Sequence, residues 1–194
     1  MLTPVDPDRA VGIAERALTL DPLDRGAMLA RANALFFARR YQEAATLIQR
    51  LRQESKNRRG ATLLVNTLLA LGQTDAARQL VPQVPKGWQQ PFYRALIEAQ
   101  AGNRAAADAA LAAFRTLDNG TAHYQFAVLH AQRGEIPAAL ASIEKALKAQ
   151  DAGLNDIAVD PWLDPLRKEP RFKAVQDKII PPDLFVPARL APVA

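Results

Sequence analysis

Between residues 25 and 58, apolar side chains recur every three or four positions, the spacing that places them on one face of an α-helix. The apolar residues of 28–36 predict a first helix and those of 44–51 a second, with Arg39 and Arg40 at the turn between them. Neither helix can bury its apolar stripe alone. A unit of this kind therefore predicts neighbouring units stacked against it.

This helical hairpin recurs along the chain at intervals of 30 to 33 residues. Each copy has a turn residue followed five positions later by an alanine, in the pairs Arg39/Ala44, Gly72/Ala77, Gly102/Ala107 and Gly134/Ala139. Twelve positions before each alanine stands another small or compact residue: Ala32, Val65, Ala95 and Ala127. Small residues at both places let paired helices approach closely, and a turn glycine can take the left-handed conformation that ends the first helix.

The pattern resembles the tetratricopeptide repeat (TPR), a helical hairpin of about 34 residues. The resemblance covers roughly residues 7–147 and is carried by Tyr41-Gln-Glu-Ala44, Gly134-Glu-Ile-Pro-Ala-Ala139 and Ala17-Leu-Thr-Leu-Asp21-Pro22. It implies an all-α fold, in which residues 1–150 form a right-handed superhelix of about four and a half hairpins with a concave inner surface. Two departures are Met28, where the family has Trp, and Pro85, which is predicted to shorten the second helix of its hairpin.

The amino-terminal stretch Asp8 to Leu20 has the apolar spacing of a second helix without its first. One side of this helix is then predicted to lack a partner. Residues 1–7, a second copy of the chain in a homodimer, or an upstream part of a longer protein would each cover it. We favour the last two.

The repeat stops after residue 147, and residues 151–180 are predicted to form a helical cap over the open end of the stack. This segment contains Asp160-Pro-Trp-Leu-Asp-Pro-Leu-Arg167 and Pro170-Arg-Phe172. It resembles the closing segment of TPR arrays in bacterial regulators such as winged-helix activators and class III nucleotide cyclases. That resemblance implies an alternative function, as the regulatory or sensory carboxyl-terminal part of a larger signalling or transcription protein. Residues 181–194, with four prolines, are predicted to form an extended tail.

Charge is unevenly distributed in this chain of net charge +5, because residues 25–59 contain nine Lys and Arg against two Glu. Such a surface could bind an acidic protein or a phosphate backbone, so nucleic-acid binding is a second alternative. We favour a protein partner, because long cationic side chains also solvate ordinary helix surfaces.

Motifs typical of enzymes are missing: there is no Gly-rich phosphate loop, Gly-x-Ser-x-Gly or His-Glu-x-x-His. The absence of cysteine excludes disulfides and thiolate metal sites. His123 and His130 would share a helix face but have no evident third ligand. We therefore expect no catalysis, cofactor or metal. No apolar run reaches the roughly 20 residues that span a bilayer, so we expect a cytoplasmic protein, or a periplasmic one if it is part of a larger membrane-anchored chain.

The candidate binding site lies on the first helices of the hairpins, which line the concave surface in TPR arrays. Asn33 and Asn66 occupy equivalent positions and could hold a peptide bond, because an amide both donates and accepts. Arg59 could neutralise an acidic group. The remaining candidates are apolar or polar neighbours along the groove: Phe37, Phe92, Tyr93, Gln100, Tyr124 and Gln132. The set partly resembles the TPR carboxylate clamp, which has Lys where Leu29 stands here. We therefore predict a protein–protein interaction module that binds a peptide in a concave groove.

Overall fold

The computed structural model describes residues 6–55 and 60–180, and within these ranges it contains helices and turns but no strand. This confirms the predicted all-α class. The α-helices are α1 (Pro7–Leu20), α2 (Arg25–Phe37), α3 (Tyr41–Ser55), α4 (Ala61–Ala70), α5 (Thr74–Leu80), α6 (Gln89–Gln100), α7 (Arg104–Leu117), α8 (His123–Gln132), α9 (Ile136–Ala149) and α10 (Pro170–Ile179). Three short 3₁₀ helices are η1 (Val81–Gln83), η2 (Ala152–Asp156) and η3 (Pro161–Leu166).

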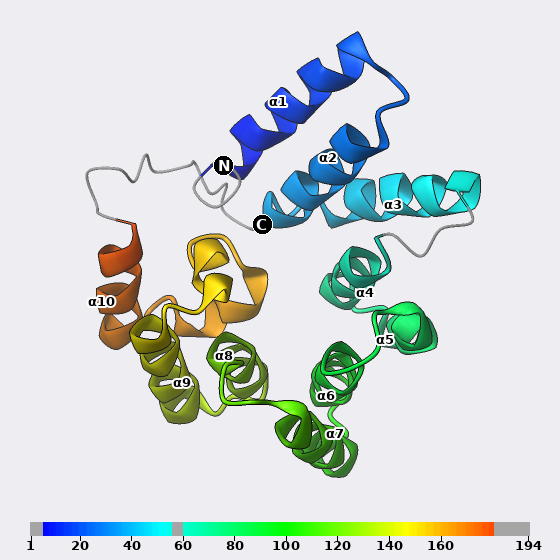
Figure 1. Cartoon of the computed structure of the whole chain (residues 1–194). Coiled ribbons are helices and arrows are strands. Elements are labelled where there is room, and N and C mark those ends of the chain that lie inside the picture. Colours follow the sequence, from blue (N-terminus) through cyan, green and yellow to red (C-terminus); the bar gives the residue numbers. More distant parts are fainter. Residues whose placement is uncertain (1–5, 56–59, 181–194) are drawn as a thin grey trace.

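Consecutive helices pack as antiparallel pairs, and the pairs follow one another along an arc (Figure 1). The pairs α2–α3, α4–α5, α6–α7 and α8–α9 correspond to the four predicted hairpins. In Figure 1, α4, α6 and α8 lie on the inner side of the arc and α5, α7 and α9 on its outer side. Contacts of α6 with both α4 and α8 link the pairs along the inner side.

The turns inside the hairpins repeat one geometry. Left-handed backbone occurs at Arg39 (φ 64°), Gly72 (φ 72°), Gly102 (φ 74°) and Gly134 (φ 74°). The amide after each of these residues donates to the carbonyl five positions before it, as in Arg40 N to Leu35 O at 2.9 Å, which completes a Schellman cap. Arg39 takes this conformation without the freedom of glycine, so side-chain contacts are needed to hold it there.

Small residues lie where the paired helices meet. The predicted alanines, which are exposed by 1% or less, are Ala44, Ala77, Ala107 and Ala139. Their partners on the first helices, which are exposed by 2% or less, are Ala32, Val65, Ala95 and Ala127. The positions that the sequence pattern marked for close approach are therefore buried.

The second helix of the second hairpin is short, as predicted, but the break comes earlier. α5 ends at Leu80, and the chain continues through η1, which contains Pro82. A proline lacks the amide that an α-helix requires and crowds the preceding turn. Pro82 rather than Pro85 is thus the first residue that ends α5.

α1 packs against α2 and buries Val11 and Ala14. Its carboxyl end stays open, since Leu20 is 89% exposed and Leu23, in the following turn, is 80% exposed. Pairing of two copies through residues 8–20 remains a prediction. At the other end of the array, α10 packs on α9, and its residues Phe172 and Val175 are buried.

Candidate binding surface on the inner side of the array

The turn η3 follows directly from its sequence. Asp160 caps it, because its Oδ1 accepts a hydrogen bond from the amide of Trp162 at 2.9 Å. Pro161 at the first position and Pro165 within the turn keep it short. Buried Leu163 lies in this turn, which packs against α8 and α9.

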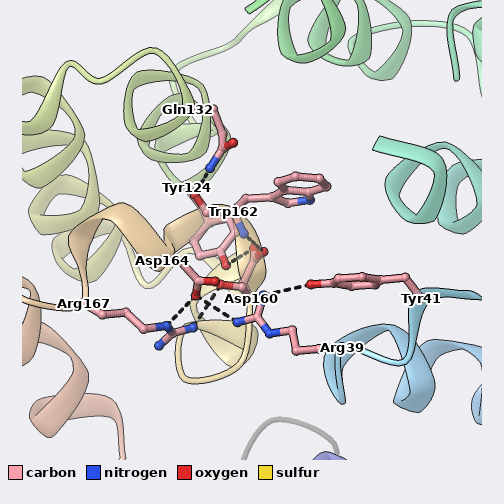
Figure 2. Close-up of polar contacts among 8 residues, drawn as sticks. All are labelled: Arg39, Tyr41, Tyr124, Gln132, Asp160, Trp162, Asp164 and Arg167. Carbon is pink, nitrogen blue, oxygen red and sulfur yellow. Dashed lines mark hydrogen bonds and ion pairs between the residues drawn. The ribbon is translucent and has the colours of Figure 1, made fainter. Parts of the chain in front are cut away.

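Trp162 extends from η3 to contact three of the inner helices. Its Nε1 donates to Asn66 Oδ1 on α4 at 3.2 Å, and its carbonyl accepts from Gln132 Nε2 on α8 at 2.7 Å. The indole ring lies 6.3 Å from the ring of Phe36 on α2, measured between centroids. Figure 2 shows Trp162 beside Gln132 and Tyr124. Part of the inner surface is therefore occupied by the chain's own carboxyl-terminal segment.

A polar network holds this segment in place. Asn66 Nδ2 donates to the Tyr93 hydroxyl at 3.0 Å, Gln100 Nε2 donates to Gln132 Oε1 at 3.4 Å, and the Tyr124 hydroxyl donates to a carboxylate oxygen of Asp160 at 2.6 Å. Five of the nine predicted site residues belong to the network: Asn66, Tyr93, Gln100, Tyr124 and Gln132. The structure brings these five residues together, but around Asp160 and η3, which we call the internal segment.

The other predicted site residues are placed differently. Phe37 and Phe92 are 9% and 7% exposed and pack edge-on against other aromatic rings, so they stabilise the array and offer little surface to a partner. Asn33 is partly exposed, and its amide makes no hydrogen bond with the described residues. Arg59 lies outside the described residues.

Asp160 is only 7% exposed, and this burial has the largest effect on the pKa of its carboxyl. Loss of hydration raises the pKa of its carboxyl to about 6, although the hydrogen bonds from Tyr124 and Trp162 favour the ionised form and lower the pKa. Burial likewise raises the pKa of Tyr124 well above its ordinary value. Arg167 lies close by, but its Nη2 donates to the backbone carbonyl of Asp160 at 3.0 Å.

An ion pair connects η3 to the opposite end of the arc. Asp164 Oδ1 accepts from Arg39 Nη2 at 2.8 Å and from Arg167 Nε at 2.7 Å (Figure 2). Arg39 is the left-handed residue of the α2–α3 turn, and its Nη1 also donates to the Tyr41 hydroxyl at 3.1 Å. These contacts hold the unusual backbone of Arg39. We predicted that residues 151–180 would cap the open end of the stack. α10 packs on the last hairpin, and η3 also turns inward and reaches the first.

The turn before η3 depends on a glycine. A Cβ atom at Gly153 would lie 2.7 Å from Tyr124 Cβ and closer still to the ring, which is too close for real contacts. We expect Gly153→Ala to displace η2 or Tyr124 and to lower the free energy of unfolding by about 1–3 kcal/mol, measured by urea denaturation. The control is Gly12→Ala in α1, where a methyl group meets nothing within 4 Å and should be stabilising. Equal stabilities of the two variants would contradict this prediction.

An open groove of about 480 Å³ remains between α2 and α4. On α2 the lining residues fall at positions i, i+3, i+4 and i+7, and on α4 they fall at positions i, i+1 and i+4, so each helix contributes a single face. They are Gly26, Leu29, Ala30 and Asn33 on α2, and Gly60, Thr62, Leu63 and Asn66 on or just before α4. Two of the predicted site residues, Asn33 and Asn66, thus border the same groove.

Carboxylates of the described residues pair with three of the nine basic residues of the stretch 25–59. Arg31 binds Glu15 at 2.9 Å, Arg40 binds Glu43 at 2.6 Å, and Arg39 binds Asp164 as described above. These pairs reduce the positive charge that the surface presents to a phosphate backbone. Nucleic-acid binding stays a prediction.

The two histidines do not share a partner among the described residues. His130 Nδ1 lies 2.6 Å from Glu135 Oε2, and His123 makes no such contact with Glu135. Within residues 6–55 and 60–180, no group of three His, Cys, Asp or Glu side chains could hold a metal ion. In the same residues, no helix is both long and apolar enough to cross a bilayer.

Comparisons of the chain with protein-family models, with curated proteins and with solved structures found no match. The resemblance to TPR proteins therefore rests on the residues that carry it and on the all-helical packing described above.

Proposed function

We propose that the chain is a protein-binding module, a right-handed TPR-like array that takes an extended peptide of its partner on the inner surface between α2 and α4. The observation that carries this proposal is the open groove of about 480 Å³ bordered by both helices. A preformed groove on helices favours binding, because little ordering entropy is lost on the side of the array.

The chemistry of the groove suits a peptide with one large apolar side chain. Leu29 and Leu63 supply apolar walls from the two helices. The amide of Asn33 can donate to a peptide carbonyl and accept from a peptide amide, and it makes no hydrogen bond with the described part of the chain. Exposed Arg25, at the start of α2, favours a partner with an acidic residue near the apolar one.

The internal segment supports this mode of recognition. Trp162 buries an aromatic ring among the inner helices while a glutamine amide holds its backbone carbonyl. The groove, to which α2 contributes Asn33 and α4 contributes Leu63, offers a partner the same combination of apolar burial and backbone hydrogen bonding. Asn66 is already held by Tyr93 and Trp162, so it forms a fixed wall of the groove and Asn33 supplies the free amide.

The proposal is tested by selecting peptides from a displayed library and measuring their affinity by fluorescence anisotropy. Leu63→Glu is expected to raise the Kd of a selected peptide at least tenfold, because it places a charge in the apolar wall. Asn33→Ala is expected to raise the Kd severalfold by removing a hydrogen bond. The control is Leu117→Glu, at a 55% exposed leucine at the end of α7. Failure to select any peptide, or equal effects of Leu63→Glu and Leu117→Glu, would refute the proposal.

A further inference from the structure

A second cavity, of about 410 Å³, lies away from the inner groove where the ends of four helices meet. It is bordered by residues at the start of α6 and α8 and at the end of α7 and α9. Its apolar wall is aromatic: Phe114 is fully buried, and the Trp88 ring stands 6.1 Å from it while remaining 39% exposed. Leu117, 55% exposed, forms part of the rim. Large apolar side chains are thus left open to solvent around a concave site.

The charged residues that line this cavity are both acidic, Asp118 and Asp151, and no Lys, Arg or His is among the described lining residues. Asp118 Oδ1 accepts from three backbone amides of the α7–α8 loop, each at 3.0 Å, and no described residue donates to its Oδ2. Asp151 accepts from the amides of Gly153 at 2.9 Å and Tyr124 at 3.0 Å. Backbone contacts therefore hold both carboxylates in position at the cavity.

An acidic cavity on a chain of net charge +5 selects against anions. An exposed tryptophan face attracts a cation, and a carboxylate forms a charge-assisted hydrogen bond with an ammonium or guanidinium group. The volume lies toward the small end of the roughly 300–1,000 Å³ of small-ligand sites. We propose that this cavity binds an organic cation, an ammonium or guanidinium group on a short apolar stem. Such a group is carried by a free amine or guanidine, and equally by an arginine or lysine side chain of a partner.

The NMR signals of the two tryptophan side chains allow binding at this cavity to be measured. Trp88 lines the cavity, and Trp162, the only other tryptophan, lies in the internal segment with its Nε1 bonded to Asn66. Titration of ¹⁵N-labelled protein with n-butylguanidinium is expected to shift the indole signal of Trp88 saturably and to leave that of Trp162 in place. The neutral probe 1-pentanol should bind at least fivefold more weakly. Equal binding of both probes, or a response of Trp162 alone, would overturn the proposal.

Three variants test whether binding depends on this cavity or only on the net charge of the chain. Asp118→Asn keeps an oxygen that can accept from the loop amides but removes the charge, and should raise the Kd of n-butylguanidinium at least fivefold. Asp75→Asn removes the same charge from an exposed position on α5 and should change the Kd less than twofold. Leu117→Lys, at the exposed rim, should also weaken binding because it supplies a competing cation. Equal effects of the two aspartate variants, or unchanged binding in Leu117→Lys, would refute the site.

The source of the cation is distinguished by a second titration with the blocked tripeptide Gly-Arg-Gly. If it binds as tightly as n-butylguanidinium or more tightly, the site takes an arginine side chain of a partner. If only n-butylguanidinium binds, the site takes a free small molecule. If neither probe shifts the Trp88 signal at millimolar concentration, the proposal fails, and this outcome leaves the peptide groove between α2 and α4 unaffected.

Discussion

Replacing Trp162 with alanine is expected to lower the free energy of unfolding by about 3–5 kcal/mol, the cost of removing a large buried aromatic ring. The ring is 8% exposed and lies against Phe36, and its indole nitrogen bonds to Asn66. Its loss leaves a cavity between α2, α4 and α8 and removes the contact that joins them to η3. Urea denaturation followed by circular dichroism measures the change, and hydrogen exchange in residues 152–166 should rise with it.

The matched control is Trp162→Phe, which keeps an aromatic ring in the site but removes the donor to Asn66. This variant should lower the free energy of unfolding by an amount nearer the roughly 1 kcal/mol of a single hydrogen bond, with a further loss because its ring is smaller. If Trp162→Ala lost less than about 1 kcal/mol, η3 would not be a stabilising part of the array. The occupied inner surface described here would then not persist in solution.

The repeat itself was predictable because its signals are local. A left-handed turn needs a glycine or a held side chain, and close helix approach needs small residues, so Gly72 and Ala77 mark their hairpin within a few positions. The same signals place the helices of the other hairpins. Pro82 was overlooked, although it precedes Pro85 and the first proline along a helix already removes a required amide.

The role of the inner-surface residues was not predictable in the same way. Helical spacing shows which side chains share a face, but it does not show what covers that face. Asn66 and Tyr93 lie on the inner side as expected, yet Asn66 bonds not only to Tyr93 but also to Trp162, which is 96 residues away from Asn66 in sequence. The apolar residues of the closing segment predicted burial. Only the folded arrangement shows that η3 turns toward α2 and α4 and leaves an open groove beside Asn33.

The cavity at Trp88 was not foreseen because its lining comes from the ends of four helices. The aspartates Asp118 and Asp151 are recognisable in sequence as helix caps, and they do cap the turns that follow them. A cap gives no indication that the same residue also lines a cavity with an aromatic residue from a distant helix. The aspartates and Trp88 line one cavity only because the packing of α7 and α8 brings α6 and α9 together.

The stability of the chain should depend on pH through Asp160. Its pKa in the folded chain is about 6, against 3.8 for an unperturbed aspartate, so the folded state binds this proton more tightly than the unfolded state. The stabilisation is complete below pH 3.8 and is lost as the pH rises to about 6. The two pKa values correspond to a loss of roughly 3 kcal/mol over this range.

The variant Asp160→Asn isolates this contribution. Its side-chain oxygen can still accept from the amide of Trp162, so the cap of η3 is kept while the buried charge is removed. The free energy of unfolding of the variant, minus that of the native chain, should be small near pH 3.5 and should increase by roughly 3 kcal/mol between pH 4 and 7. Urea denaturation across this pH range measures the difference.

The free energy of unfolding of the native chain must be subtracted because other carboxyls change it with pH in the opposite direction. Ion pairs with arginines lower the pKa of Glu43 and Glu144, so their stabilisation is present at neutral pH and is lost on acidification. These groups are common to the native chain and the variant and cancel in the difference. A difference for Asp160→Asn that does not change with pH would mean that the carboxylate is hydrated, and that η3 is not closed over Tyr124 as the hydrogen bond between them requires.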